Sequence, residues 1–172
     1  NSVPSQNRPC EYARGDLHLR IGPGGMDLSL EIDIDDYVLG ISEMPYYWGF
    51  ESNSGLEALK AQALAARSYA RELQIHRPPP GDNLCAAWCD VRDTTIDQRY
   101  VGWGHVGLGI DEWIEAVDST ANQVITHPDA PNGTVVRAYY SSSSGGFTEN
   151  VHEVSSAYPE FTEYLSSVDD HW

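Results

Sequence analysis

The sequence predicts a single mixed domain of the α+β class, with antiparallel strands packed on a long alanine-rich helix and a second, shorter helix. Apolar residues alternate at period two near the start of the chain, a long alanine-rich helix pattern follows, and shorter strand and helix patterns come after it in mixed order. The 172 residues suffice for one domain that buries about two-thirds of its unfolded surface. Residues 1–15 are predicted to be a loose polar lead-in, and residues 16–172 the domain itself.

An antiparallel pair of strands is predicted at the start of the domain. Leu17, Leu19 and Ile21 alternate with polar residues up to a Gly-Pro-Gly-Gly turn at 22–25, and the alternation resumes over residues 26–34. Because successive strand side chains point to opposite faces, the apolar residues share one face and the other face is exposed to solvent.

The strongest helix pattern runs from about Leu56 to His76. Its apolar residues recur at three- and four-residue steps, and its alanines favour the helix and allow a neighbour to pack closely. The Pro-Pro-Pro-Gly sequence at 78–81 ends this helix.

Further elements are predicted in the second half of the chain. A shorter amphipathic helix is expected around residues 110–120, with Trp113 and Val117 on its apolar stripe. Residues 123–127 and 134–140 are expected to be strands, joined by a turn that contains proline, asparagine and glycine.

The charge and the motifs exclude several classes of function. The chain has 26 acidic and 10 basic residues, a net charge of −16, which repels nucleic acid and anionic lipid but not neutral carbohydrate. Its apolar runs are too short for a transmembrane helix. It lacks a Walker loop, a dinucleotide-binding glycine turn, a Gly-x-Ser-x-Gly elbow and a His-Glu-x-x-His helix, so no cofactor is predicted. Asn1 opens a polar stretch without a signal peptide, so we expect a processed product or part of a longer chain.

Three cysteines cannot all pair within the chain. A disulfide between Cys85 and Cys89 is the first expectation and leaves Cys10 over, whereas a bridge from Cys10 to either one frees the other. The close pair could instead hold half of a zinc site with His76, although structural zinc usually takes four such ligands.

Glu43 is the candidate for acid–base chemistry. It lies in a Ser-Glu-Met-Pro sequence just before Tyr46, Tyr47 and Trp48. Apolar rings disfavour the charged form of a carboxyl group, which is the condition for a general acid. From these residues alone, Glu43 could equally be an exposed turn residue, and the aromatic trio could be a core cluster, a surface cluster or a platform for sugar rings.

Two further groups of residues could bind a ligand. Lys60 and Arg67 are seven residues apart, so both project from the same side of the long helix, where they could meet an acidic group or simply form a solvated face. Serines and glycines follow Tyr140 at 141–146, and such small residues can bring backbone amides close to a ligand, or form a flexible loop.

Several stretches of the chain resemble the stage II sporulation protein D (SpoIID) family, which shares a domain with the amidase-enhancer protein LytB. They are Asp-Tyr-Val-Leu-Gly at 36–40 with Glu-Met-Pro at 43–45, the helix sequence at 57–70, Asp-Thr-Thr at 93–95 with Gln98, Tyr100 and Gly102, Ser-Ser-Ser-Gly-Gly at 142–146 with Thr148, Glu149 and Asn150, and Tyr164, Leu165, Ser167 and Val168. They occur in the family's order over roughly residues 30–170, which makes the resemblance specific.

The resemblance implies a lytic transglycosylase that cleaves peptidoglycan glycan strands, preferably strands stripped of peptides, without a cofactor. The family's catalytic glutamate falls on Glu43. Its implied substrate-binding residues are Lys60, Arg67, Gln98, Tyr140, Ser143, Ser144, Gly145 and Gly146. The implied location is extracellular or in the cell envelope.

Two alternatives accompany this reading. The LytB resemblance also suits a non-catalytic protein that binds the wall and stimulates an N-acetylmuramoyl-L-alanine amidase, and a glycan-binding module of a larger protein is a third possibility. The sequence departs from the family pattern at Ser141, where histidine is common, at 154–159, where a Trp-Gly pair is missing, and at 46–55, which carries extra residues. These departures bear on how the substrate fits.

Overall fold

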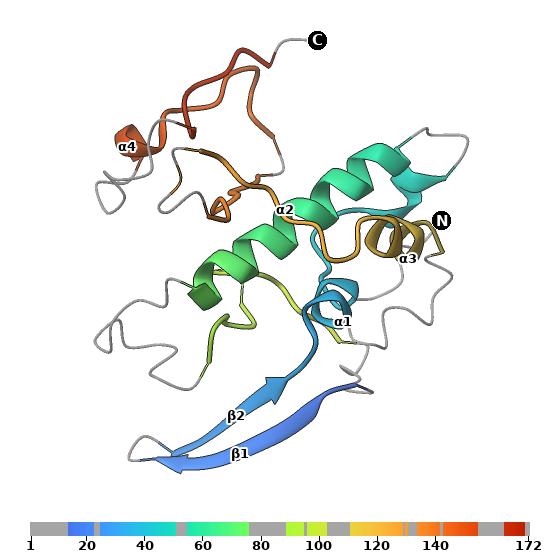
Figure 1. Ribbon diagram of the computed structural model, residues 1–172, viewed down its shortest axis with the longest axis vertical. Coiled ribbons are helices and arrows are strands. Elements are labelled where there is room, and N and C mark those ends of the chain that lie inside the picture. Colours follow the sequence, from blue (N-terminus) through green and yellow to red (C-terminus); the bar gives the residue numbers. More distant parts are fainter. Residues whose placement is uncertain are drawn as a thin grey trace.

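The computed structural model confirms the α+β class. It describes residues 14–22, 25–50, 55–75, 89–94, 96–102, 111–128, 130, 134–141, 143–154 and 164–170. The elements are β1 (Asp16–Gly22), β2 (Gly25–Glu31), α1 (Ile34–Leu39), the 3₁₀ helix η1 (Tyr46–Gly49), α2 (Leu56–Ile75), α3 (Asp111–Ser119) and α4 (Val151–Val154). The long helix α2 lies between the hairpin at one end of the molecule and α4 at the other (Figure 1).

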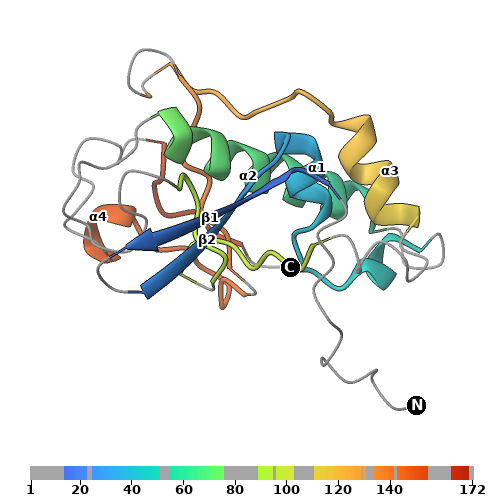
Figure 2. The same ribbon diagram turned by 90° about the horizontal axis from the view of Figure 1, so that it is seen from below.

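The predicted hairpin is confirmed, with the apolar residues of both strands on one face. Leu17 pairs with Leu30, Leu19 with Leu28, and Ile21 with Met26. This face is largely exposed, however, and the elements that pack against α2 are α1, η1 and α3. The hairpin extends away from that helical body in Figure 1, and in the view from below its two strands are drawn in front of the helices (Figure 2).

The chain turns into helix α1 earlier than the alternating pattern predicts. Asp33 caps this helix, because its side chain accepts a hydrogen bond from the backbone amide of Asp35 at 2.9 Å. Asp35 and Asp36 lie in the first turn, where negative charge interacts favourably with the positive end of the helix dipole. Ile34 is therefore the first residue of a helix rather than the last residue of a strand.

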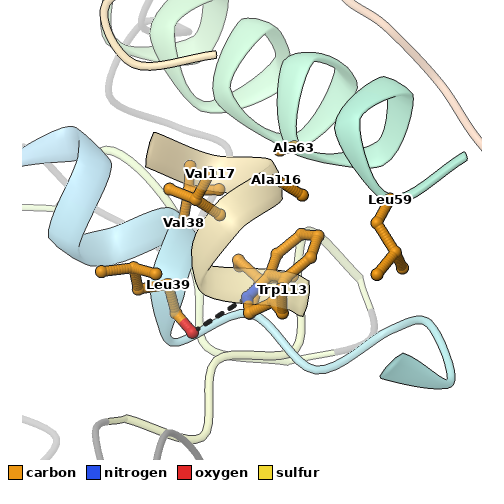
Figure 3. Close-up of a cluster of buried hydrophobic side chains, with 8 residues drawn as sticks. Val38, Leu39, Leu59, Ala63, Trp113, Ala116 and Val117 are labelled. Carbon is orange, nitrogen blue, oxygen red and sulfur yellow. Dashed lines mark hydrogen bonds between the residues drawn. The ribbon is translucent and has the colours of Figure 1, made fainter. Parts of the chain in front are cut away.

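The main core lies where α1, α2 and α3 meet. Buried Trp113 and Val117 of α3 pack with Leu59 and Ala63 of α2 (Figure 3), so the predicted amphipathic helix and its apolar stripe are confirmed. The indole nitrogen of Trp113 donates to the backbone oxygen of Leu39 at 3.2 Å, which satisfies its polar atom inside the core.

Arg67 joins the same three helices through polar contacts. It is 1% exposed, and its Nε donates to Asp35 of α1 at 2.6 Å. Its other nitrogens donate to the hydroxyl of Thr120 at 3.4 Å and to the backbone oxygens of Val117 and Gln123 at 3.3 and 3.2 Å. The guanidinium thus links the helices, and the loss of one member of this buried ion pair would leave the other charge without its partner.

The two strands predicted after α3 are reduced to a short contact. Thr126 and Val135 form an isolated antiparallel bridge, and the amide of Val136 donates to the carbonyl of Ile125 at 2.9 Å. The amide of Ile125 donates instead to the Ser68 hydroxyl of α2 at 2.8 Å, which attaches this segment to the helix. Within the part of the chain described, no helix is long and apolar enough to span a membrane.

Candidate functional site

Glu43 lies beside the segment that carries the middle sequence motif. Ile41 forms an antiparallel bridge with Tyr100, and the amide of Ser42 donates to the carbonyl of Arg99 at 3.0 Å. The backbone amide of Arg99 in turn donates to Oε1 of half-buried Glu43 at 2.7 Å. Backbone pairing thus fixes the position of this carboxyl group.

Tyr140 and Gln98 extend the hydrogen bonding from Glu43 into the interior. Tyr140 is hydrogen-bonded to Glu43, and Nε2 of Gln98 donates to the Tyr140 hydroxyl oxygen at 3.1 Å. The same Gln98 nitrogen donates to the carbonyl of Ala66 at 3.1 Å, while its Oε1 accepts from the Tyr37 hydroxyl at 2.9 Å. Tyr37, Glu43, Gln98 and Tyr140 are called the Glu43 cluster below.

The donors and acceptors of the cluster have a defined direction. Because the Ala66 carbonyl can only accept, it requires the amide nitrogen of Gln98 on its side. The oxygen of Tyr140 accepts from Gln98, so its hydrogen is directed to Glu43. The carboxyl group therefore faces two donors, the Tyr140 hydroxyl and the Arg99 amide.

The two tyrosines of the cluster stay protonated over the ordinary pH range. Burial, followed by the charges of Tyr140 and Glu43, raises the pKa of Tyr37 far above its ordinary value. Burial, followed by the hydrogen bond with Glu43, also raises the pKa of Tyr140. Both hydroxyls are therefore neutral donors rather than phenolates.

Aromatic packing and a glycine hold this cluster against the middle motif. The rings of Tyr37 and Tyr100 stack with centroids 5.3 Å apart and an interplanar angle of 9°. Gly40 passes so close that a Cβ there would lie 2.2 Å from the Tyr100 ring. Only glycine fits at this contact without displacing the ring.

The loop that carries Gln98 is itself ordered by charged groups. Arg92 donates from two guanidinium nitrogens to the two carboxylate oxygens of Asp97, each at 2.7 Å, and its backbone amide donates at 2.9 Å. Burial acts to raise the pKa of Asp97, but the contacts with Arg92 outweigh it and leave that pKa below its ordinary value. Asp93 accepts from the amide of Tyr100 at 3.0 Å, and burial raises the pKa of this carboxyl.

The structure places two of the predicted substrate-binding residues, Gln98 and Arg67, in the interior. Gln98 is 0% exposed, and its side chain is hydrogen-bonded to Tyr140 and Tyr37. Arg67 is enclosed by Asp35 and α3, so its charge serves the helix packing. Half-buried Lys60 donates to the exposed Glu57 at 2.7 Å and remains a candidate for binding.

Of the three aromatic residues after Glu43, one packs against the core and two are exposed. Tyr46 points inward, where its hydroxyl donates to the carbonyl of Ile41 at 2.5 Å and its ring contacts Trp113 at a centroid distance of 5.4 Å. Tyr47 and Trp48 are exposed.

The Ser/Gly segment forms a tight turn that contacts the closing segment. The amides of Gly145 and Gly146 donate to the hydroxyls of Ser143 and Ser144, each at 3.2 Å, so these two amides are already bonded. Ser144 also donates to Asp170 at 2.6 Å. Their predicted role in substrate binding remains a prediction.

One cysteine takes part in a disulfide whose partner lies outside the described residues, so the expected pairing of Cys85 with Cys89 stays a prediction. Cys89 is disulfide-bonded, which overturns the zinc alternative for this sulfur because a disulfide has no thiolate to offer a metal. Cys10, Cys85 and His76 lie outside the described residues.

Two contributors to the site had no role assigned from sequence. The Tyr37 hydroxyl donates a hydrogen bond to the side-chain oxygen of Gln98, and Arg99 contributes only its backbone amide, which donates to Glu43. Tyr37 lies in the first sequence motif, three residues before Gly40, and this position was the available signal. A backbone amide leaves no such signal in a sequence.

Comparison with known proteins identifies the family to which the sequence is similar. The SpoIID family model, described as "Stage II sporulation protein", matches residues 23–127. The chain is 35% identical over 116 residues to the amidase enhancer of Bacillus subtilis, an alignment that covers 67% of this chain and 13% of that protein. It is 32% identical to the stage II sporulation protein D of B. subtilis over 155 residues and to that of Bacillus amyloliquefaciens over 156, each covering 82% of this chain and 39% of the relative.

The chain therefore spans less than half the length of each of these relatives. The matched region nevertheless takes in α1, η1, α2 and α3 together with Glu43 and Gln98. Since the family model matches more than half of the 172 residues, the chain belongs to the SpoIID family.

Proposed function

We propose that this chain is a peptidoglycan lytic transglycosylase in which Glu43 is the catalytic acid and base. The observation that carries the proposal is the carboxyl group of Glu43, half-buried and oriented by the Arg99 amide and by Tyr140. The names of the relatives, an amidase enhancer and sporulation proteins, support a role at the cell wall.

A single carboxyl group is enough for this reaction. Protonated Glu43 gives its proton to the glycosidic oxygen between N-acetylmuramic acid and N-acetylglucosamine, and the C1–O bond breaks. The C6 hydroxyl of the muramoyl unit then bonds to C1, and the Glu43 carboxylate takes the proton of that hydroxyl. The products are a 1,6-anhydro-muramoyl end and a free sugar hydroxyl, no water is consumed, and Glu43 is protonated again.

The surroundings of Glu43 favour the carboxylate form that it takes midway through this reaction. Hydrogen bonds from Tyr140 and Arg99 stabilise the carboxylate that forms when the proton leaves. An ordinary glycosidase needs a second carboxylate as nucleophile or water base. Asp93 and Asp97, the acids on the neighbouring loop, are instead engaged with the Tyr100 amide and with Arg92.

The remaining parts of the proposal concern the substrate and its location. Lys60 can contact the lactyl carboxylate of the muramoyl unit, and Ser143, Ser144, Gly145 and Gly146 can line the glycan groove. Glycan strands of the wall place the enzyme outside the cytoplasmic membrane or in the cell envelope. The site as described needs no metal or cofactor for the steps above.

A second candidate function is a wall-binding protein that stimulates an amidase. The observation in its favour is the match to a protein named amidase enhancer. In that case Glu43 would contribute to binding, and its replacement would leave stimulation of the amidase largely intact.

The test is product analysis on peptide-free glycan strands by mass spectrometry. The wild-type protein is expected to produce 1,6-anhydro-muramoyl ends, Glu43→Gln none, and Glu115→Gln on the exposed side of α3 the wild-type amount. Reducing ends, which are heavier by one water molecule, would show hydrolysis and contradict the mechanism. No cleavage by a folded wild-type protein, together with stimulation of a purified amidase, would favour the second candidate.

A further inference from the structure

An unusual cluster of exposed aromatic side chains follows Glu43. Tyr47 is 57% exposed, Trp48 43% and Phe50 44%, all within four residues. Aromatic residues carry large apolar surfaces, and an exposed apolar patch made of several of them is typical of a binding site. These three residues are called the η1 aromatic face below.

The 3₁₀ conformation of η1 explains why these three residues are exposed. With three residues per turn, Tyr46 and Gly49 occupy the same side of the helix, and Tyr47 and Phe50 share another. The first side is buried, because Tyr46 packs on Trp113 and a Cβ on Gly49 would lie 2.5 Å from Leu59. Tyr47, Trp48 and Phe50 therefore lie on the part of the turn that faces solvent, away from the side that packs on the core.

Both ends of this turn are fixed to the body of the protein. The Tyr46 hydroxyl donates to the Ile41 carbonyl at 2.5 Å, and the amide of Gly55, just before α2, donates to the carbonyl of Trp48 at 2.9 Å. A Cβ on Gly55 would lie 2.2 Å from that carbonyl oxygen, so the close approach requires glycine. A backbone fixed in this way lowers the entropy lost when the rings engage a ligand.

The face is also close to the candidate catalytic group. Only Met44, Pro45 and Tyr46 separate Glu43 from Tyr47, and four extended residues span at most about 14 Å. In a glycan strand bound at Glu43, the sugar units next to the reacting one would lie within this distance.

We propose that Tyr47, Trp48 and Phe50 form a platform on which pyranose rings of the glycan strand stack, in subsites beside Glu43. This inference rests on the proposed function and names the binding surface for its substrate. The C–H face of a pyranose ring is apolar and packs on an aromatic ring, while the hydroxyl groups at its edge remain hydrated. An uncharged surface suits this ligand in a protein with net charge −16, because the muramoyl units themselves carry carboxylates.

Binding, measured without turnover, tests the platform. Each of Tyr47→Ala, Trp48→Ala and Phe50→Ala is made in the Glu43→Gln background, and the Kd for peptide-free glycan strands is measured by calorimetry. We expect Trp48→Ala to weaken binding about tenfold, equivalent to about 1.4 kcal/mol. Ile21→Ala, which shortens an exposed apolar side chain on the hairpin, is the matched control and is expected to leave Kd unchanged.

A second measurement reports on the stacking itself. Trp48 fluorescence should change when N-acetylglucosamine hexamers are added, and this change should be lost in Trp48→Ala but kept in Ile21→Ala. Circular dichroism and thermal unfolding confirm that each variant is folded.

The outcomes separate this inference from the proposed function. Weaker binding by the platform variants supports the platform even if no anhydro product is ever found. Anhydro products formed by a protein whose Kd and KM do not change in any of the three variants would overturn the platform and leave the catalytic proposal intact. Loss of amidase stimulation with unchanged glycan binding would show that the face binds a protein, and would also overturn it.

Discussion

The side-chain amide of Gln98 donates a hydrogen bond to the hydroxyl oxygen of Tyr140 at 3.1 Å, and this contact orients Tyr140 toward Glu43. Gln98 itself is buried and held by the Ala66 carbonyl and the Tyr37 hydroxyl. A residue without access to solvent thus controls the hydrogen bond received by the candidate catalytic acid.

The first prediction concerns this contact. Gln98→Leu and Tyr140→Phe should each lower kcat for glycan cleavage by about 10- to 100-fold, because both remove the same oriented donor from Glu43. KM should change less than kcat for Gln98→Leu. The double variant should be little worse than either single variant, because the two residues act through one bond. Additive losses would contradict the coupling, and product analysis by mass spectrometry gives the rates.

The second prediction concerns the contribution of the Tyr37 hydroxyl to the stability of the protein. Tyr37→Phe keeps the ring stacked on Tyr100 but leaves Oε1 of Gln98 without its donor. An unsatisfied buried acceptor should lower the free energy of unfolding by about 1–3 kcal/mol. Urea denaturation measures this loss. Ile21→Ala, which shortens an exposed side chain on the hairpin, should stay within about 0.5 kcal/mol of the wild type.

The third prediction distinguishes Lys60 from Arg67, two of the basic residues of α2. Arg67→Met should lower the free energy of unfolding by about 3–5 kcal/mol, because it leaves Asp35 without its buried partner. Lys60→Met should cost about 1 kcal/mol or less, since Glu57 is exposed. Lys60→Met should instead raise KM for glycan strands if its charge meets the substrate. An Arg67→Met protein as stable as the wild type would show that the guanidinium has no packing role.

The fourth prediction uses opposite effects of pH on two neighbouring acids. The folded pKa of Asp97 lies below its unfolded value, so its contribution to stability is present above about pH 3.8 and is lost as the pH falls through the folded value. The folded pKa of Asp93 is raised, so its contribution is present below that pH and is lost as the pH rises through the folded value.

At about pH 7, Asp97→Asn should therefore destabilise the protein, by about 1–3 kcal/mol because Arg92 loses its charged partner. Asp93→Asn should be neutral or slightly stabilising, because the amide oxygen can still accept from Tyr100 and no buried charge remains. Urea denaturation at neutral and acidic pH measures both effects, with Asp118→Asn on the exposed side of α3 as the control. The same sign for both variants at neutral pH would contradict the assignment.

Much of the fold was predictable because its signals are local. The alternation in Leu17, Leu19 and Ile21 fixed the hairpin faces, and the three- and four-residue steps located α2 and α3. Helix α1 was missed, because Ile32 and Ile34 continue the alternating pattern and only the cap at Asp33 redirects the chain. The pattern also indicates which residues share a face but not what covers that face, so the exposure of the hairpin could not be foreseen.

The site was predictable in its members but not in their roles. The order of the motifs selected Glu43, Gln98 and Tyr140, and the structure brings these three together. Spacing along α2 placed Lys60 and Arg67 on one side, yet α3 covers Arg67. Burial depends on neighbours that are distant in sequence, so a spacing of seven residues could not separate a half-buried lysine from a fully buried arginine.

The fixed direction of the hydrogen bonds in the Glu43 cluster has a consequence for how Glu43 is reprotonated. An amide group does not give up its N–H proton at ordinary pH, and the hydroxyls of Tyr37 and Tyr140 stay protonated, so the row of groups behind Glu43 is an insulator rather than a proton wire. Through these described residues, no proton reaches the carboxyl group from the interior. Each proton that Glu43 donates must return from its open side, from the substrate hydroxyl or from solvent, and the solvent isotope effect on cleavage should therefore originate entirely at that side.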